Sequence, residues 1–146
     1  ELDYVGVMAM ECFATASELL VNELAPRVHN SGHWSQLGAE HDQFALHLRA
    51  LLDLPLPRKQ IYRPTLMLNL IGCDFEPGWL EIPGLQCHWY GKTPRPGRKV
   101  GHINIGLENM ATAQNCAASL RLLLDGAHQQ ILDEAFRLVE RKTRAS

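Results

Sequence analysis

The sequence predicts an α+β fold, and three observations indicate it. Two apolar runs near the N-terminus flank a short turn, prolines and glycines divide the middle of the chain into short strand-like pieces, and apolar residues recur at helical spacing toward the C-terminus. With 146 residues, 46% of them apolar, the chain can bury a core as one ordinary domain or two small ones.

The first predicted elements are two strands joined by a short turn. Residues 4–13 (YVGVMAMECF) are apolar almost throughout, which is typical of a strand covered on both faces. Residues 14–17 are few and small enough for a turn, and residues 18–25 (ELLVNELA) predict the returning strand. Pro26 ends this strand because proline has no N–H to give to a ladder.

A loop over residues 27–38 and a helix over residues 39–52 are expected next. The side chains expected to face inward are Phe44, Leu48, Leu51 and Leu52, and those expected outside are Asp42, Gln43 and Arg49. The two prolines in LDLPLPRKQ resist continuation of the helix. We therefore expect two domains, residues 1–60 and residues 61–146.

The second domain is expected to be β-rich with a helical tail. Residues 64–72 predict a buried strand, residues 73–84 a loop, and residues 85–91 and 98–105 a hairpin around the turn KTPRPG. The tail, residues 109–142, predicts two helices separated at Asp125-Gly126. Their expected inward residues are Ala111, Cys116, Leu120, Leu123 and Leu124, then Ile131, Leu132, Phe136 and Leu138.

Composition narrows the class of function. The net charge of −2 argues against a dedicated nucleic-acid binder, which needs excess Lys and Arg. Residues 1–60 carry four basic and eight acidic side chains, and residues 61–146 carry ten and eight, which gives −4 and +2. This mild asymmetry suits two segments that face one ligand from opposite sides.

The cysteines and the apolar runs indicate a cytoplasmic location. Cys12, Cys73, Cys87 and Cys116 are far apart with no C-x-x-C pair, which disfavours a zinc site or a disulfide framework and favours reduced thiols. No apolar run approaches the ~18 residues of a membrane span, and no signal peptide is visible. Because the chain starts without Met and soon enters an apolar run, we expect it to be the middle of a protein.

Two carboxylates in the predicted strand pair suggest a metal site. An unpaired Glu11 in an apolar strand would cost several kcal/mol, so it needs a cation, and Glu11, Glu23 and the neighbouring Asn22 suit Mg²⁺, which prefers oxygen ligands. Alternatively, each Glu lies at a strand end and meets water or an Arg. A tight turn pairing Phe13 with Glu18 would put the two carboxylates on opposite faces, so the metal hypothesis needs a one-residue shift or bulge.

Two further groups could bind an anion. Arg27, His29, Asn30, Ser31 and His33 follow the second strand, where Arg can bind carboxylate or phosphate and His can transfer protons. The alternative is a loop whose side chains cap its own backbone. The turn KTPRPGRK adds four cations, Lys92, Arg95, Arg98 and Lys99, which form either a phosphate site or a solvated hairpin tip.

These residues carry a family resemblance. E-C-F followed by L-L-V-N-E-L-A-P-R-V-H-N-S-G-H-W resembles the ATP-grasp enzymes of purine biosynthesis, most closely the ATPase subunit of phosphoribosylaminoimidazole carboxylase, or 5-(carboxyamino)imidazole ribonucleotide synthase. M-L-N-L-I-G and H-W-Y-G-K-T-P-R-P-G-R-K-V-G-H-I-N are similar to its C-terminal domain, in the same order. The resemblance covers about residues 5–104. It implies the C-terminal part of an ATP-grasp domain, followed by a small domain with a rudimentary hybrid motif.

The resemblance also implies a reaction. Such enzymes use ATP and Mg²⁺ to phosphorylate bicarbonate and transfer the carboxyl group to the amine of 5-aminoimidazole ribonucleotide, as cytoplasmic homodimers. By this likeness Glu11 and Glu23 would bind Mg²⁺, and Asn22 would reach the metal or the triphosphate. Arg27 and His29 would act at the reacting end of the substrate together with Asn30 and Ser31, and Lys92, Arg98 and Lys99 would hold the ribonucleotide phosphate.

Two other functions remain open. A sister ATP-grasp ligase, such as a formate-using or glycine-using purine enzyme or a biotin carboxylase, would share paired metal carboxylates but should differ in the loop P-R-V-H-N-S-G-H. An inactive fragment that binds only anions or a partner is the non-enzymatic alternative. The nucleotide lid of an ATP-grasp enzyme does not precede Glu1, so we expect the chain alone to lack activity.

Overall fold

The computed structural model describes residues 3–144, with side chains described through residue 142. The chain divides into two compact units, unit 1 up to Tyr62 and unit 2 from Arg63 onward. Within residues 3–144, no helix is long and apolar enough to cross a membrane. All four cysteines are free thiols.

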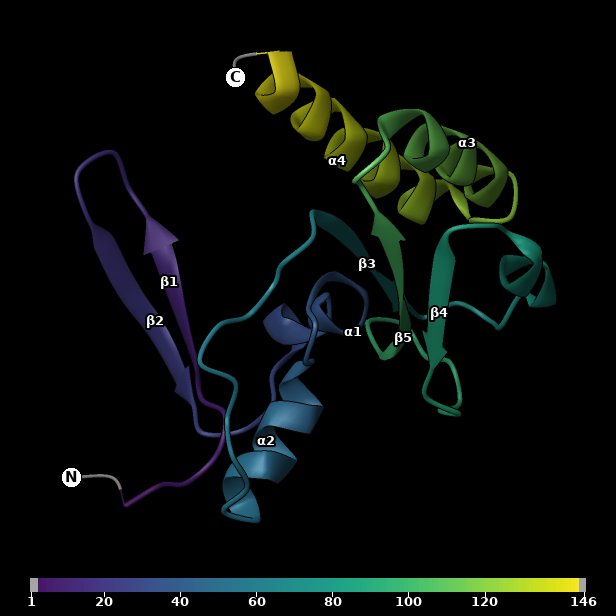
Figure 1. Ribbon diagram of the computed structural model, residues 1–146. Coiled ribbons are helices and arrows are strands. Elements are labelled where there is room, and N and C mark those ends of the chain that lie inside the picture. Colours follow the sequence, from purple (N-terminus) through teal and green to yellow (C-terminus); the bar gives the residue numbers. More distant parts are fainter. Residues whose placement is uncertain (1–2, 145–146) are drawn as a thin grey trace. The chain divides into compact units, whose positions relative to one another are not determined.

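Unit 1 consists of a two-stranded antiparallel ribbon followed by short helices (Figure 1). Its elements are β1 (Ala9–Ala14), β2 (Leu19–Ala25), the 3₁₀ helix η1 (Asn30–Gly32), α1 (Ser35–Gly38) and α2 (Gln43–Leu51). The predicted strand pair is present, but β1 starts at Ala9 and residues 4–8 are not strand. Ala9 pairs with Ala25, and Pro26 ends β2, so residues before Ala9 have no partner on β2.

Both faces of the ribbon are exposed in this structure. Met10 and Phe13 of β1, and Val21 and Leu24 of β2, keep more than half of their surface accessible. The expectation of a strand covered on both faces is therefore wrong for unit 1 by itself. A lone two-stranded ribbon offers no second layer to cover its apolar side chains.

The helix predicted over residues 39–52 is shorter and faces differently. It begins at Gln43 because the Asp42 carboxylate accepts hydrogen bonds from the N–H groups of Phe44 and Ala45, at 2.8 and 2.9 Å, as an N-cap. The predicted inward residues Phe44, Leu48, Leu51 and Leu52 are exposed, whereas Gln43, predicted outside, is only 6% exposed. The predicted loop before it also contains η1 and α1.

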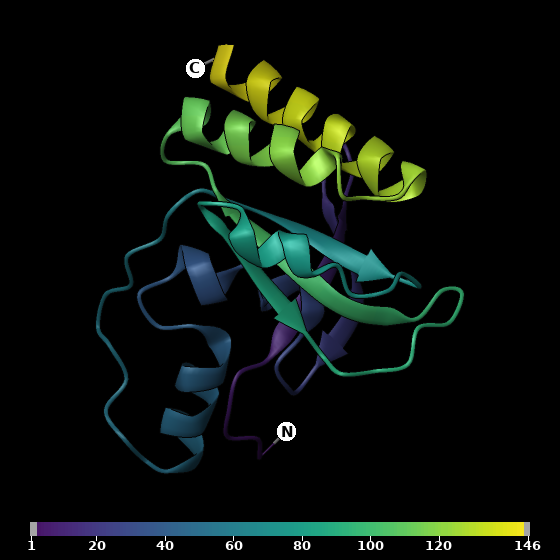
Figure 2. The same ribbon diagram turned by 90° about the vertical axis from the view of Figure 1, so that its right-hand side faces the viewer.

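Unit 2 is a three-stranded antiparallel sheet in the order β3-β5-β4, with α3 and α4 side by side over one face (Figure 2). Its elements are β3 (Thr65–Ile71), the 3₁₀ helix η2 (Pro77–Glu81), β4 (Leu85–Trp89), β5 (Lys99–Gly106), α3 (Met110–Arg121) and α4 (Gly126–Arg144). The predicted hairpin is confirmed, because β4 pairs with β5. The loop predicted before it contains η2.

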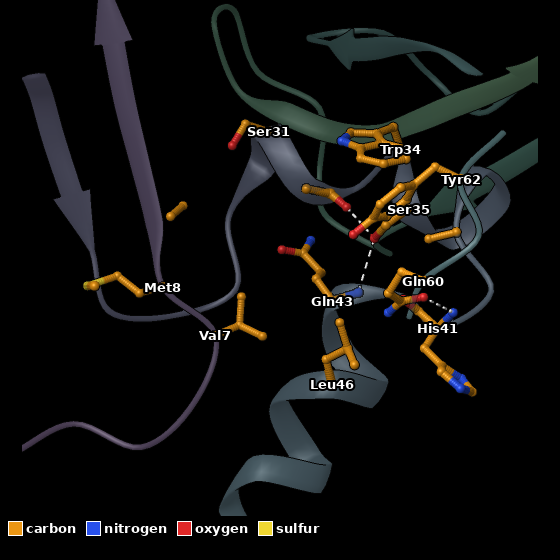
Figure 3. A pocket seen from close by; sticks show the side chains of 13 residues that line it. Val7, Met8, Ser31, Trp34, Ser35, His41, Gln43, Leu46, Gln60 and Tyr62 are labelled. Atoms are coloured by element: carbon orange, nitrogen blue, oxygen red, sulfur yellow. Dashed lines mark hydrogen bonds between the residues drawn. The ribbon is translucent and has the colours of Figure 1, made fainter. Parts of the chain in front are cut away.

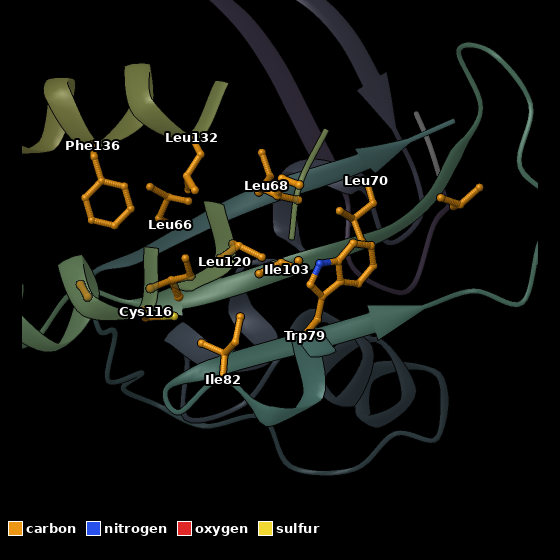
Figure 4. Packing of buried hydrophobic residues seen from close by; sticks show 14 residues of the cluster. Leu66, Leu68, Leu70, Trp79, Ile82, Ile103, Cys116, Leu120, Leu132 and Phe136 are labelled. Atoms are coloured by element: carbon orange, nitrogen blue, oxygen red, sulfur yellow. The ribbon is translucent and has the colours of Figure 1, made fainter. Parts of the chain in front are cut away.

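The core of unit 2 lies between the sheet and the two helices (Figure 4). Leu66, Leu68 and Leu70 alternate along β3 toward this core, as the two-residue period of a strand requires. Ile103 and Ile105 of β5 are fully buried beside them. Further contributors come from β5, from η2 and its C-cap, and from the helices and the residues after α3: Val100, Trp79, Ile82, Ala113, Cys116, Leu120, Leu124, Leu132 and Phe136.

The predicted inward faces of the tail helices are partly wrong. Cys116, Leu120 and Leu124 are buried, but Leu123 and Ala111 are exposed, and Ala113, three residues before Cys116, is buried in place of Ala111. Leu132 and Phe136 are buried, whereas the flanking apolar residues of α4, Ile131 and Leu138, are about half exposed. One stripe at four-residue spacing is enough to cover the sheet.

A buried histidine ties α4 to the edge strand β3. Register shifts between Leu70 and Ile71, so the Ile71 N–H donates to Nε2 of His128 at 3.0 Å. Nδ1 of His128 lies 2.8 Å from Oδ1 of Asp125. Hydrogen bonds from the backbone and the side chain of His128 lower the pKa of Asp125. His128 is 4% exposed, so its imidazole serves as an internal link between helix and strand.

Replacing this histidine should destabilise unit 2. His128→Leu fills the site with an apolar side chain of similar size but leaves the N–H of Ile71 without an acceptor, which costs about 1–3 kcal/mol. Urea unfolding followed by circular dichroism should show this loss. Leu122→Ala, at a position 84% exposed, is the control and should stay within about 0.5 kcal/mol. Equal effects of the two substitutions would contradict the assigned role.

Candidate functional site

One extra residue in β2 sets the geometry of the candidate site. Cys12 pairs with Val21 and Glu11 pairs with Glu23, so Asn22 lies between them without a partner on β1. This is a β-bulge, in which two residues of one strand oppose one of the other. An unbroken register would pair Glu11 with Asn22 and turn Glu23 to the opposite face. The bulge that the metal hypothesis requires is therefore present.

The turn that joins the strands has Ala16 and Ser17 at its tip and does not pair Phe13 with Glu18. The Thr15 N–H donates to the Glu18 carbonyl at 3.0 Å, and Ala14 pairs with Leu19. Phe13 therefore pairs with Leu20 rather than Glu18. Turn and bulge together decide which side chains of β2 share a face with Glu11.

Both carboxylates face the same imidazole. Nε2 of His29 lies 4.0 Å from Oε2 of Glu11 and 3.7 Å from Oε1 of Glu23, and Nη2 of Arg27 lies 3.7 Å from that same Glu23 oxygen. These distances are too long for hydrogen bonds, so the contacts are electrostatic. Like charges directly opposite on two strands repel, and the nearby guanidinium of Arg27 offsets part of that repulsion.

The hydrogen bonds of His29 fix which ring nitrogen faces the carboxylates. The backbone N–H of Ser31 donates to Nδ1 of His29 at 3.3 Å, and the Ser31 hydroxyl lies 2.9 Å from the same nitrogen. A backbone N–H can only donate, so Nδ1 is an acceptor and the neutral ring carries its proton on Nε2. His29 therefore presents an N–H to Glu11 and Glu23.

The loop that carries His29 is held against α2 by buried polar groups. The hydroxyl of Ser35 donates to the Gly32 carbonyl and accepts from the backbone N–H of Gln43 at 3.0 Å (Figure 3). Both side chains line a cavity of about 380 Å³ in unit 1, between the start of β1 and the helices. Sequence reasoning missed Gln43; its only signal was its place directly after the helix-capping Asp42.

The donor set of Glu11 and Glu23 fits a magnesium ion that arrives with phosphates. Among the described residues, no three or more His, Cys, Asp and Glu side chains form a group that could hold a metal. Mg²⁺ is commonly held by one or two carboxylates, with substrate phosphates and water completing six oxygen ligands. Two carboxylates on one face meet that requirement.

The second group of predicted residues lies around the turn between β4 and β5. The ammonium groups of Lys92 and Lys99 lie 5.1 and 5.6 Å from the centre of the Tyr90 ring, so two cations approach one aromatic ring. Burial, followed by the charge of Lys92, lowers the pKa of Lys99 to about 8. The Tyr90 hydroxyl lies 2.6 Å from Nδ1 of His102, and burial raises its pKa to about 12.

The other predicted residues are placed as follows. Asn30 and Ser31 lie in η1, and His33 is its C-cap. Arg98 donates from Nη1 to the Thr93 carbonyl at 3.3 Å and stays exposed at the turn. The candidate residues thus fall into two groups, one in each unit.

Family models match both units. A model of the ATP-grasp domain matches residues 1–44, and one of the phosphoribosylaminoimidazole carboxylase C-terminal domain matches residues 65–115. The N5-carboxyaminoimidazole ribonucleotide synthase of Haemophilus influenzae is 63% identical over 111 residues, which are 76% of this chain and 31% of the relative. The Escherichia coli enzyme of that name is also 63% identical, over 72% of this chain and 30% of the relative.

Solved structures agree with these matches. The N5-carboxyaminoimidazole ribonucleotide synthetase of Thermus thermophilus has a TM-score of 0.71 at 50% identity, covering 85% of this chain and 35% of that one. The Aspergillus clavatus synthase, solved with ADP and 5-aminoimidazole ribonucleotide, has a TM-score of 0.68 at 34% identity, covering 88% and 35%. The chain spans about a third of the length of the curated relatives. It belongs to the ATP-grasp family of N5-carboxyaminoimidazole ribonucleotide synthases, whose C-terminal portion it matches.

Proposed function

We propose that this chain is part of an ATP- and bicarbonate-dependent ligase that carboxylates 5-aminoimidazole ribonucleotide on its amine. The observation that carries the proposal is the bulge at Asn22, which places Glu11 and Glu23 on one face beside His29. A relative of the same fold binds ADP and this ribonucleotide. The enzyme would act as a homodimer in the cytoplasm.

We assign each group in unit 1 a task in this reaction. Glu11 and Glu23 would hold Mg²⁺ against the triphosphate, and Asn22 would reach the metal or a phosphate oxygen. Arg27, whose side chain is 61% exposed and lies 3.7 Å from Glu23, would bind the bicarbonate or carboxyphosphate anion. A bound metal would screen the carboxylates and neutralise charge on the transferring phosphoryl group.

His29 would act at the reacting end of the ribonucleotide, with Asn30 and Ser31 beside it. Its neutral ring offers a proton on Nε2, so in this form it donates a hydrogen bond to an oxygen of the acyl phosphate or the substrate. Its Nδ1 already accepts from Ser31, which holds the ring orientation while Nε2 meets the substrate.

In unit 2, Lys92, Arg98 and Lys99 would hold the ribonucleotide phosphate. The ammonium groups of Lys92 and Lys99 lie beside one Tyr90 ring, and the pKa of Lys99 is lowered by burial first and then by the charge of Lys92, so the two cations repel each other. A phosphate dianion between them would relieve this repulsion and gain charge-assisted hydrogen bonds. The remainder of an ATP-grasp domain would supply the nucleotide pocket and cover the exposed apolar faces of β1 and β2.

Removing one metal ligand should abolish most turnover without unfolding the protein. In the full-length protein that carries this sequence, Glu23→Gln should lower kcat about 100-fold, because the metal loses one of its two carboxylates. Glu18→Gln, an exposed carboxylate at the turn end of the same ribbon, is the matched control and should keep normal turnover. Ribonucleotide-dependent ATP hydrolysis measures both, and unchanged hydrolysis in Glu23→Gln would contradict the assignment.

Binding of the ribonucleotide should depend on the charge of Lys99. Its pKa of about 8 lies below the ordinary value, so the protonated form is lost as pH rises through 8, while the ligand phosphate stays dianionic above its second pKa of about 6. Affinity, measured by calorimetry on the full-length protein, should fall about tenfold between pH 7.5 and 9.5. Lys99→Arg keeps its charge and should remove this dependence; an identical fall in that variant would exclude Lys99 as its source.

A further inference from the structure

The side chain of Gln43 holds the backbone of His29 at two points. Its Oε1 accepts the His29 N–H at 2.9 Å, and its Nε2 donates to the His29 carbonyl at 2.9 Å. Because the amide oxygen can only accept and the amide NH2 can only donate, the His29 N–H and carbonyl together fix the orientation of the amide. One amide therefore constrains both sides of the residue that carries the candidate imidazole.

The same amide also orients a second imidazole. Nε2 of Gln43 lies 2.7 Å from Nδ1 of His33, and since Nε2 can only donate, Nδ1 of His33 accepts. The His33 ring stacks on Phe44, with centroids 5.6 Å apart and planes 13° from parallel. The amide of Gln43 thus joins His29, His33 and the first turn of α2 in one partly buried network.

Close packing around the Gln43 side chain restricts the orientation of its amide. Gln43 is 6% exposed, and its backbone N–H donates to Ser35. Gly32 passes so close that a methyl group on its Cα would lie 2.5 Å from Oε1 of Gln43. Gly32 does not have a positive φ, so the lack of a side chain there serves the amide and not the backbone conformation.

We propose that Gln43 is a positioning residue, which fixes His29 so that Nε2 faces Glu11 and Glu23. This inference rests on the proposed function, because it assigns Gln43 to the site that performs the carboxylation. Gln43 itself touches neither carboxylate and acts through His29. Displacing a reacting group by about 1 Å can cost up to 100-fold in rate, so loss of the clamp should be visible in turnover.

The chain contains a matched control for this clamp. Oε1 of Gln60 accepts the His41 N–H at 3.3 Å, and its Nε2 donates to the His41 carbonyl at 3.2 Å (Figure 3). Gln60 therefore makes the same two-point contact to a histidine backbone, in the same unit and beside the same cavity. His41 has no proposed role in the site. Substituting Gln60 therefore shows whether the loss of such a two-point contact lowers activity wherever it occurs, or only at His29.

The activity test uses the full-length protein that carries this sequence. Gln43→Met removes the amide at nearly equal length and should lower kcat at least tenfold while the KM for ATP changes less than twofold. Gln60→Met should leave kcat within twofold of the unaltered protein. Gly32→Ala, which displaces the amide without removing it, should lower kcat in the same direction as Gln43→Met. Equal effects of Gln43→Met and Gln60→Met, or no effect of either, would overturn the proposal.

A second measurement reads the network without turnover. In Gln43→Glu an ionised carboxylate replaces the donor facing His33, so long-range ¹H–¹⁵N spectra of the 146-residue chain should show the neutral His33 ring moving its proton from Nε2 to Nδ1. Gln60→Glu should leave the His33 tautomer unchanged. An unchanged tautomer in Gln43→Glu would overturn the assigned network. If the unaltered full-length protein fails to carboxylate the ribonucleotide, the proposed function fails, and the spectra still decide whether the clamp exists.

Discussion

The bulge in β2 controls which chemistry this chain can present. In a regular ribbon, residues of one strand alternate between faces, and the identity of the facing residues is fixed by the register. One unpaired residue, Asn22, resets that alternation between Val21 and Glu23, so that Glu23 shares a face with Glu11. The electrostatic contacts of His29 with both carboxylates, and of Arg27 with Glu23, depend on this placement.

A second layer of structure holds the loop that faces these carboxylates. Pro26 ends β2, and the chain then turns back through η1 and α1 to the start of α2, where Asp42 caps the helix. The buried amide of Gln43 and the hydroxyl of Ser35 bond the loop backbone to that helix start. Hydrogen bonds of this kind are buried and satisfied, so they stabilise a single loop conformation rather than several. The side chains of Glu11 and Glu23 are about half exposed, while hydrogen bonds from Gln43 and Ser35 hold the loop beside them.

Local sequence signals predicted the elements well, because each depends on nearby residues. Pro26, the turn KTPRPG and Asp125-Gly126 end or separate elements close to where the structure does. The buried faces were less predictable. The period of apolar residues in α2 indicated that Leu48 and Leu51 face inward, but unit 1 by itself has no layer to cover them, whereas in unit 2 the sheet covers Leu120 and Leu132.

The residue types of the candidate site could be recognised in the sequence, but their positions relative to one another could not. Glu11, Glu23, Arg27 and His29 could be identified as candidates from their residue types and spacing. Their mutual placement depends on a bulge whose position no local pattern reveals, since every residue of ELLVNELA can occupy a regular strand. Gln43 was missed because a polar residue in the first turn of a helix is ordinarily solvent-exposed.

The most direct test of the central claim removes the bulge and measures metal binding. In the full-length protein with ADP present, the affinity for Mn²⁺, used as a paramagnetic substitute for Mg²⁺, can be titrated by electron paramagnetic resonance. Deleting Asn22 should restore an unbroken register, turn Glu23 away from Glu11 and weaken Mn²⁺ binding at least tenfold more than Asn22→Ala, which keeps the extra residue. If the deletion weakens binding no more than Asn22→Ala does, the bulge does not assemble the metal site.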